Sequence, residues 1–408
     1  MDDVAIRAIG PDEFDAFYAT DAAAFGSPID AESKAQERET FEYERSLAVF
    51  DAHQIVATAA AYSFALAVPG AVVPAAGVTF VAVLPTHRRR GLLTRLMTRQ
   101  LAEIPEPVAV LWASEAPIYE RFGYAPASRH LLLDVLLDVG CPAAFVPEAP
   151  ADPVLRLRLV DPGDARPELA AVNDPVWTAR PGHFARTPAW WGGVLLDSER
   201  ERAGAAPLRC VLAADGDGPR GYGLYATVSA WDDGMANGTV RVRELCARDP
   251  AAEAALWRYL LDLDLMRRLT VTLPPDAALV HLLVDPRQAR PRMHDNLWAR
   301  LVDVPTALSR RRYASELDVV LDVTDAVRPA NTRRWRLTAN AGGATCGPTR
   351  DAPDLALPVA ALGAAYLGGT RLSALAGAGR VRELRPGALD AASRAFAGDR
   401  EPYCPEEF

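Results

Sequence analysis

The sequence has 408 residues, of which half are apolar, and a formal net charge of −9 at pH 7. This length predicts two or three domains with ample buried cores. No run of about 18 residues lacks polar breaks, which argues against a membrane span, and the negative charge argues against non-specific binding of nucleic acid and slightly favours a cationic substrate.

Five cysteines are scattered along the chain, namely Cys141, Cys210, Cys246, Cys346 and Cys404. Their spacing matches no common metal site, so we expect no bound metal and a reduced, cytoplasmic protein. The first residues, Met-Asp-Asp, are acidic rather than basic, which is unlike the start of a secretory signal peptide.

The most informative stretch joins a strand to a helix through a basic turn. Apolar residues 78–83 predict a strand, and apolar residues at helical spacing predict a helix over 92–104. The turn between them reads Arg88-Arg89-Arg90-Gly91. The free N–H groups and the dipole of a helix N-terminus, beside a glycine that lets a ligand approach the backbone, favour phosphate binding. An Arg-rich helix start without a ligand is the alternative.

The order of elements around the turn narrows the interpretation. Antiparallel strands are predicted before it over residues 46–50, 55–62 and 64–67. After the helix comes an apolar strand over 108–112, followed at once by Ser114-Glu115 and a short helix that ends at Gly123.

This arrangement resembles the GNAT superfamily of N-acetyltransferases, in which Arg-x-x-Gly-x-(Gly or Ala) binds the pyrophosphate of acetyl-CoA. Here the pattern is Arg88-x-x-Gly91-x-Leu93, and its last position departs from the general superfamily. The run Pro-Thr-His-Arg-Arg-Arg-Gly-Leu-Leu and the later Ser-Glu-x-x-Ile-Tyr-x-Arg-Phe-Gly-Tyr are similar to the Eis (enhanced intracellular survival) subfamily, which carries the bulkier residue. The resemblance covers the whole chain, down to Glu407-Phe408.

The resemblance implies an α/β (α+β) fold with tandem GNAT folds and a C-terminal sterol-carrier-protein-like domain. We expect an N-terminal acetyltransferase domain over residues 1–140, which ends in a strand at 131–139, and a Pro- and Ala-rich linker over 141–153. A central GNAT-like domain over 154–303 and the third domain over 304–408 follow. Lipid binding by the third domain does not follow from the resemblance.

The central domain repeats the element order of the first but not its basic turn. At the corresponding place it reads Ala247-Arg248-Asp249-Pro250. Because proline removes an N–H group and aspartate repels phosphate, we expect a degenerate domain that does not hold the cofactor.

Acetyl-CoA is the co-substrate that the resemblance implies. The backbone of Val81–Val83 would pair with the pantetheine arm where this strand splays from the next at a bulge, and an N–H group there would polarise the thioester. An ordinary buried strand is the alternative. The cofactor-binding residues implied are Val81, Ala82, Val83, Arg88, Arg89, Arg90, Gly91, Leu92, Leu93, Thr94, Ser114 and Glu115. His87 is expected to be a neighbour of the phosphates rather than a proton shuttle.

Two residues take catalytic roles by the resemblance. Tyr119 occupies the position of the general acid, since a phenol of pKa about 10 can protonate a departing thiolate of pKa about 8.5. The α-carboxylate of Phe408 would act as base or orient the amine, and a frayed tail is the alternative. Tyr124 is expected to serve packing and Cys404 to be a bystander.

The acceptor site is implied less directly. Phe25 and Phe80 align with pocket aromatics of the family and Glu407 with an acidic lining residue. Ser27 stands where the family has an acidic residue, so Asp21, Asp30 or Glu32 would have to compensate.

The sequence therefore predicts an acetyl-CoA-dependent N-acetyltransferase that acts on cationic multi-amine substrates: aminoglycosides, lysine side chains or polyamines. The resemblance also implies a homohexamer. A non-catalytic acyl-CoA- or lipid-binding regulator is the alternative function, and a transferase of longer acyl groups is a third.

Overall fold

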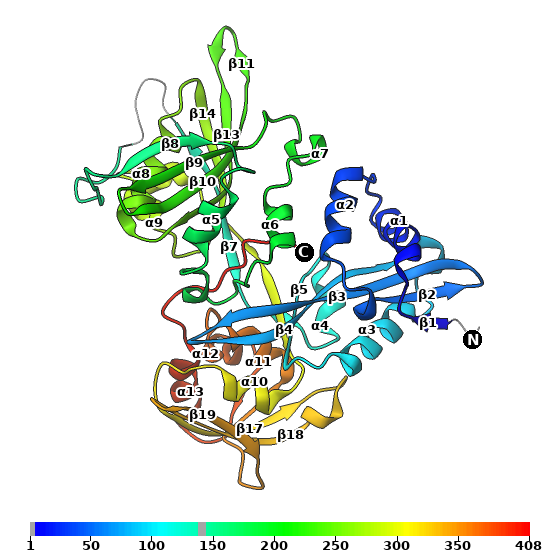
Figure 1. Cartoon of the computed structure of the whole chain (residues 1–408). Coiled ribbons are helices and arrows are strands. Elements are labelled where there is room, and N and C mark those ends of the chain that lie inside the picture. Colours follow the sequence, from blue (N-terminus) through cyan, green and yellow to red (C-terminus); the bar gives the residue numbers. More distant parts are fainter. Residues whose placement is uncertain (1–4, 138–143) are drawn as a thin grey trace. The chain divides into compact units, whose positions relative to one another are not determined.

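The computed structural model describes residues 5–137 and 144–408. The chain forms two compact units (Figure 1). The first contains the chain up to Ser128, the short segment Thr178–Ala185 and Asp295–Phe408, and the second contains Arg129–Trp177 and Arg186–His294. None of the helices within the described ranges combines the length and the apolar character that crossing a membrane requires.

The first unit is built on a mixed seven-stranded sheet. Its strand order is β1-β2-β3-β4-β5-β16-β6. The strands are β1 (Ala5–Arg7), β2 (Leu47–Asp51), β3 (Gln54–Val68), β4 (Ala71–Val83), β5 (Val108–Trp112), β16 (Leu297–Leu301) and β6 (Ala125–Pro126). The helices of this part are α1 (Phe14–Phe25), α2 (Ala31–Thr40), α3 (Leu92–Glu103) and α4 (Ala116–Glu120).

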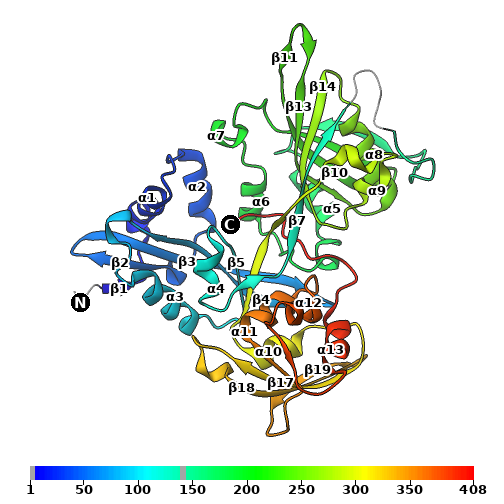
Figure 2. The same ribbon diagram turned by 180° about the vertical axis from the view of Figure 1, so that it is seen from behind.

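Helices cover both faces of this sheet, and β2 shows why. Its side chains alternate between the two faces. Ala48 and Phe50 pack in one cluster with α1 residues, whereas Leu47 and Val49 pack in another with Leu92 and Leu96 of α3. The views from the front and from behind both show α1 and α3 on opposite sides of the sheet (Figures 1 and 2).

The sheet opens between β4 and β5. These two strands run parallel, and their pairing ends at Gly77 and Val110, although β4 continues to Val83. Opposite the unpaired part, a bulge interrupts the pairing of β3 with β4, and Phe80 within it has φ +51°. The Thr58 hydroxyl donates a 2.8 Å hydrogen bond to the Phe80 carbonyl and so stabilises the bulge.

The C-terminal part of the first unit has its own five-stranded sheet of order β19-β18-β17-β20-β21. The strands are β17 (Leu317–Thr324), β18 (Arg333–Asn340), β19 (Gly343–Pro348), β20 (Leu355–Pro358) and β21 (Arg382–Glu383). The helices are α10 (Val304–Arg310), α11 (Val359–Tyr366), α12 (Leu372–Gly377) and α13 (Ala388–Phe396). Helix α11 packs on β16 so closely that a Cβ atom at Gly363 would lie 2.3 Å from the Ala299 carbonyl oxygen.

A buried ion pair joins this part to the first sheet. Arg300 of β16 donates a 2.7 Å hydrogen bond to Asp325, and both side chains are almost completely shielded from solvent. Arg300 also donates to the Phe122 carbonyl, just after α4. Since a buried charge is costly unless it is paired, this contact fixes β16 against the end of α4.

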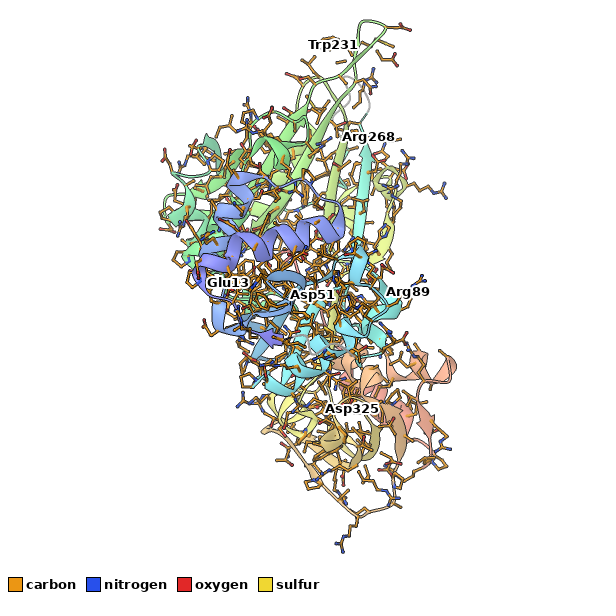
Figure 3. All side chains as sticks on the ribbon, turned by 90° about the vertical axis from the view of Figure 1, so that its right-hand side faces the viewer. Glu13, Asp51, Arg89, Trp231, Arg268 and Asp325 are labelled. Carbon is orange, nitrogen blue, oxygen red and sulfur yellow. The ribbon has the colours of Figure 1, made fainter. Side chains whose placement is uncertain are left out.

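The second unit is a second GNAT-like sheet of order β15-β7-β14-β13-β10-β9-β8. The strands are β7 (Arg129–Leu136), β8 (Arg156–Val160), β9 (Arg209–Asp215), β10 (Gly218–Val228), β13 (Gly238–Ala247), β14 (Met266–Leu273) and β15 (Arg292–Asp295). Its helices are α5 (Arg166–Asn173), α6 (Pro188–Val194), α7 (Glu199–Arg202), α8 (Pro250–Leu261) and α9 (Ala278–Leu282). A small hairpin of β11 (Trp231–Asp232) and β12 (Met235–Ala236) carries the exposed Trp231 on its first strand (Figure 3).

Two strands do not lie in the sheet that chain order suggests. Strand β7, expected at the end of the N-terminal domain, pairs with β14 in the second sheet. Strand β16, which falls within the range 154–303 expected for the central domain, pairs with β5 and β6 in the first sheet. The compact units therefore do not end at residues 140 and 303. The last positions of the predicted strand, 138 and 139, and Cys141 lie outside the described residues.

Candidate active site

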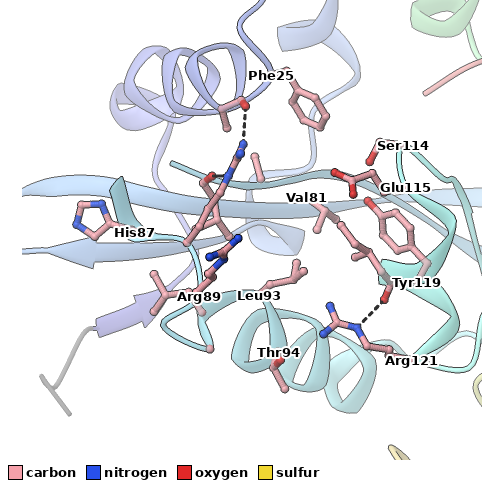
Figure 4. A pocket seen from close by; sticks show the side chains of 17 residues that line it. Phe25, Val81, His87, Arg89, Leu93, Thr94, Ser114, Glu115, Tyr119 and Arg121 are labelled. Atoms are coloured by element: carbon pink, nitrogen blue, oxygen red, sulfur yellow. Dashed lines mark hydrogen bonds between the residues drawn. The ribbon is translucent and has the colours of Figure 1, made fainter. Parts of the chain in front are cut away.

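A pocket of about 640 Å³ opens where β4 leaves β5, on the side of α3 and α4 (Figure 4). Nearly all of the predicted cofactor-binding residues line it. The lining residues are Ala24, Phe25, Val81, Ala82, Val83, His87, Arg88, Arg89, Gly91, Leu92, Leu93, Thr94, Ser114, Glu115, Ile118, Tyr119 and Arg121. Arg90 and Phe80 are not among them.

The N-terminus of α3 forms one end of this pocket. Gly91 precedes the helix with φ +77°, and none of the described side chains caps the first turn. A Cβ atom built on Gly91 would meet no described atom within 4 Å, so the space over the turn is open. Free N–H groups beside an open space fit the phosphates of a coenzyme.

The three arginines of the turn point in different directions. Arg88 donates to the carbonyls of Ala24, at 3.0 Å, and Val83, at 3.3 Å, and so ties the turn to the end of α1. Arg89, whose φ is +62°, lies along the pocket beside Leu93 (Figure 4). Arg90 lies 3.9 Å from Asp51 instead. Arg89 is therefore the arginine best placed for a phosphate.

His87 lines the pocket and also supports the turn. Its Nε2 atom lies 3.1 Å from a carboxylate oxygen of Asp51, and its Nδ1 atom lies 2.8 Å from the Thr86 hydroxyl. Both ring nitrogens are thus engaged by neighbours, which suits a residue that holds the turn in shape.

The bulge separates Phe80, which is expected to contact the acceptor, from Val81–Val83, which are expected to contact the donor. Val81, Ala82 and Val83 line the pocket with the backbone that β5 leaves unpaired. The side chain of Phe80 turns to the opposite face of the sheet, where its ring centroid lies 5.7 Å from the ring centroids of both Phe17 and Phe41. Phe80 therefore does not line this pocket; its ring belongs to the aromatic cluster under α1, and its predicted contact with the acceptor stays a prediction.

Tyr119 of α4 lines the pocket beside Ser114 and Glu115 (Figure 4). Burial raises the pKa of the phenol, a hydrogen bond with Ser114 lowers it in part, and the charges of Asp21 and Glu115 raise it further. The phenol therefore keeps its proton at neutral pH. Tyr124 is completely buried, burial raises its pKa as well, and its hydroxyl finds no hydrogen-bond partner among the described residues.

Two half-buried carboxyl groups, Asp21 and Glu37, lie on α1 and α2. Burial, with a smaller contribution from the charge of Glu37, raises the pKa of Asp21 to about 7. Burial also raises the pKa of Glu37, which accepts a 2.8 Å hydrogen bond from the Tyr62 hydroxyl of β3. The Oδ1 atom of Asp21 has no hydrogen-bond partner within the described ranges. A cation would satisfy this group.

Of the three acidic residues proposed to compensate for Ser27, Asp21 is the one near the site. Asp30 caps α2 by accepting a 2.8 Å hydrogen bond from the Ser33 amide, and Glu32 is exposed. The sequence did not reveal Glu37 and Tyr62, because only the packing of α2 on β3 brings these two side chains together.

The C-terminal tail docks on the first unit. The Trp112 indole donates a 2.8 Å hydrogen bond to the Glu406 carbonyl, and the side chain of Asn296 exchanges two hydrogen bonds with the backbone of Cys404. The ring of Phe408 packs edge-on against Phe64 at 4.8 Å. Cys404 is buried in this contact.

The two acidic residues of the tail differ in burial. Glu406 is buried, whereas Glu407, the predicted acidic lining residue, is exposed. The described residues include no group of three or more His, Cys, Asp or Glu side chains arranged to hold a metal ion.

The second unit lacks the open anion site. The Asp249 side chain caps α8 by accepting hydrogen bonds from the amides of Ala251 and Ala252, both at 3.0 Å. Arg220 donates to both oxygens of the same carboxylate, at 2.8 and 2.9 Å. The N–H groups that would bind phosphate are thus already occupied by a carboxylate of the chain itself.

Comparison with known proteins agrees with this architecture. An acetyltransferase (GNAT) domain family matches residues 5–127, a second one matches 182–301, and a sterol carrier protein domain family matches 304–405. The chain is 45% identical to an uncharacterized N-acetyltransferase of Streptomyces avermitilis, with 99% of each chain covered. It is 36% identical to the N-acetyltransferase Eis of Mycobacterium tuberculosis, with 95% of each covered.

Solved structures show the same fold. The crystal structure of Eis1 from Mycobacterium abscessus superimposes with a TM-score of 0.83 at 33% identity, covering 99% of this chain and 100% of that one. GNAT domains use acetyl-CoA as the acetyl donor, and the first domain here retains the open anion site that this donor requires. The chain is an acetyltransferase, and it belongs to the Eis family of GNAT N-acetyltransferases.

Proposed function

We propose that this protein transfers the acetyl group of acetyl-CoA to an amino group of a cationic, multi-amine acceptor by direct attack on the thioester. Aminoglycosides, lysine side chains and polyamines are the acceptor classes. The observation that carries the proposal is that Gly91, at the open helix N-terminus, and Tyr119, a buried acid, line one pocket.

The donor would lie along the opening between β4 and β5. Arg89 and the amides at the start of α3 bind the pyrophosphate, and the unpaired backbone of Val81–Val83 pairs with the pantetheine arm. A backbone N–H group of this segment then polarises the thioester carbonyl, as preorganised donors do for a developing oxyanion. Ser114 and Glu115 complete the wall beside the reacting group.

Tyr119 donates a proton to the sulfur of the departing coenzyme. Its raised pKa keeps the phenol protonated until the thiolate forms. The same burial disfavours a free thiolate in the pocket, so the proton transfer removes a charge that the surroundings do not stabilise.

The acceptor would approach from the face that α1 and α2 cover. Asp21 and Glu37 supply carboxyl groups there, whose ionised forms a bound ammonium group would stabilise, and the α-carboxylate of Phe408 serves as the base or orients the attacking amine. An acceptor with several ammonium groups suits these carboxyl groups, because one amine can react while another binds. Phe25, in the wall of the pocket, is the aromatic residue for the acceptor.

The second unit would play a structural part, since Asp249 occupies the position of the phosphates. On the family resemblance, we further propose a cytoplasmic homohexamer.

Release of free thiol from acetyl-CoA tests the proposal. A kanamycin-like aminoglycoside, a short lysine peptide and a polyamine serve as acceptors, and calorimetry measures acetyl-CoA binding. Tyr119→Phe and deletion of Phe408 should each lower kcat by about 100-fold or more, the range of a lost general acid or base, while acetyl-CoA still binds.

Tyr124→Phe is the matched control, because Tyr124 is a buried tyrosine close to Tyr119 whose hydroxyl makes no hydrogen bond to a described residue. Wild-type rates for Tyr119→Phe and for the deletion would refute the assigned roles. Acetyl-CoA binding without thiol release, for every acceptor, would favour a non-catalytic acyl-CoA sensor.

A further inference from the structure

The segment Thr178–Ala185 crosses from the second unit into the first, although the chain on both of its sides belongs to the second. It runs antiparallel to the end of β3. The Gly182 amide donates a 2.9 Å hydrogen bond to the Ala67 carbonyl, and the Ala67 amide donates a 2.8 Å bond to the His183 carbonyl. The segment is thus fixed to the first sheet by an isolated antiparallel bridge between Leu66 and Phe184.

The same segment holds the C-terminal tail. The Tyr403 amide donates a 2.9 Å hydrogen bond to the Pro181 carbonyl, and Arg180 donates a 2.6 Å bond to the Glu401 carbonyl. Gly182 has φ +100°, and a Cβ atom there would lie 2.7 Å from the Tyr403 carbonyl oxygen. Glycine is therefore required where the two backbones meet.

Phe184 carries the contact to the end of the tail. Its ring stacks on Phe64 with centroids 4.1 Å apart and planes 9° from parallel. The ring of Phe408 stands edge-on to both, at 4.8 Å from Phe64 and 6.0 Å from Phe184. Stacked and edge-on arrangements are the two favourable geometries for aromatic pairs.

This aromatic shelf, Phe64 and Phe184, lies where the sheet opens. The ring of Phe64 covers Gly77, where a Cβ atom would lie 2.1 Å from the ring. Gly77 is also the last residue of β4 that pairs with β5. The shelf therefore holds the last residue of the tail beside the opening in which the thioester is proposed to lie.

We propose that Phe184 is a positioning residue for acetyl transfer, which with Phe64 holds Phe408 so that its α-carboxylate faces the attacking amine. The inference rests on the proposed role of that carboxylate. It assigns a part in the chemistry to a residue that lies, in sequence, within the stretch matched by the second GNAT family.

A double-mutant cycle tests the proposal. Phe184→Ala, deletion of Phe408 and the combination are compared in thiol release, with Phe145→Ala as the control. Phe145 is a partly buried phenylalanine of the second unit that packs on Arg258. We expect Phe184→Ala to lower kcat about tenfold, because the variant loses two aromatic contacts. Its affinity for acetyl-CoA should stay unchanged. In the variant that lacks Phe408, Phe184→Ala should lower kcat no further.

Carboxypeptidase A supplies a readout that does not depend on activity. Phenylalanine should be released faster from Phe184→Ala than from the wild type or from Phe145→Ala, and Phe184→Leu should restore part of the protection. Equal rates of phenylalanine release from Phe184→Ala and the wild type would overturn the inference. So would a decrease in kcat by Phe184→Ala that is as large in the chain without Phe408 as in the full chain.

The cycle also separates this inference from the proposed function. If deletion of Phe408 leaves kcat unchanged, the carboxylate has no role and the catalytic part of both proposals fails. Faster release of phenylalanine from Phe184→Ala would then still support the physical contact.

Discussion

The indole nitrogen of Trp112, the last residue of β5, lies 2.8 Å from the Glu406 carbonyl oxygen, which accepts its hydrogen bond. This bond links the strand that borders the opened sheet to the tail that carries Phe408. Trp112 and the aromatic shelf therefore hold the last residues of the tail, in addition to the contacts that Asn296 and the segment Thr178–Ala185 make with its earlier residues.

Replacement of Trp112 by phenylalanine removes this donor and leaves the Glu406 carbonyl without it. We expect a loss of about 1–3 kcal/mol in unfolding free energy, together with a several-fold lower kcat at unchanged acetyl-CoA affinity. Trp335→Phe is the matched control, since the Trp335 indole donates to the Asn331 carbonyl at 3.0 Å in the C-terminal sheet. Equal effects of the two variants on kcat would contradict the prediction.

Gly91→Ala tests the open helix N-terminus. Because Gly91 has φ +77°, alanine should cost about 1–2 kcal/mol of backbone strain and place a methyl group in the open space over the turn. Gly387 precedes α13 with φ +84° and is equally open, so Gly387→Ala carries the same strain elsewhere. Calorimetry should show weaker acetyl-CoA binding for Gly91→Ala alone.

The arginines of the turn provide a second test of the donor site. Arg89→Gln should weaken acetyl-CoA binding about tenfold, as expected for the loss of a charge-assisted phosphate contact. Arg90→Gln should leave the affinity nearly unchanged, because Arg90 lies near Asp51 and does not line the pocket. The reverse ranking of the two variants would show that the turn rearranges when the donor binds.

Asp21 makes stability depend on pH. Its pKa of about 7 in the folded protein exceeds the usual value near 4. Between these values the unfolded chain loses the proton that the folded chain keeps at Asp21, so the contribution of Asp21 to stability falls as the pH rises from about 4 to 7. Asp21→Asn should therefore gain thermal stability relative to the wild type between pH 5 and pH 8.

Asp15, on the same helix, is the control for this pH dependence. Contacts with Lys34 and Arg38 lower the pKa of Asp15, so its ionised form stabilises the fold. Asp15→Asn should gain nothing at pH 8. We also expect Asp21→Asn to have a higher Michaelis constant for multi-amine acceptors, because the variant lacks the carboxylate that is proposed to bind them. Melting curves that change equally with pH for both variants would rule out the assigned ionisation.

Local patterns in the sequence were sufficient to predict the elements that form the proposed donor side of the site. The predicted strand over 108–112 coincides with β5, and the predicted helix over 92–104 ends one residue beyond α3. Both elements depend on side chains close together in sequence, which periodicity detects. The open turn between β4 and α3 follows from Gly91, whose conformation is local as well.

The acceptor side depends on contacts that no local pattern encodes. The bulge gives Phe80 a positive φ and turns it under α1. Glu37 meets Tyr62 only through the packing of α2 on β3. The burial of Glu406 rather than Glu407 depends on how the tail docks, which involves Trp112, almost 300 residues earlier in the chain.

The position of β16 between β5 and β6 also has a consequence for biosynthesis. As the polypeptide leaves the ribosome, the first sheet remains incomplete until Leu297–Leu301 has emerged, more than 170 residues after β6. Until then the backbone N–H and C=O groups along the edge of β5 have no partner strand. Exposed strand edges of this kind make nascent proteins prone to aggregation, which chaperones counter.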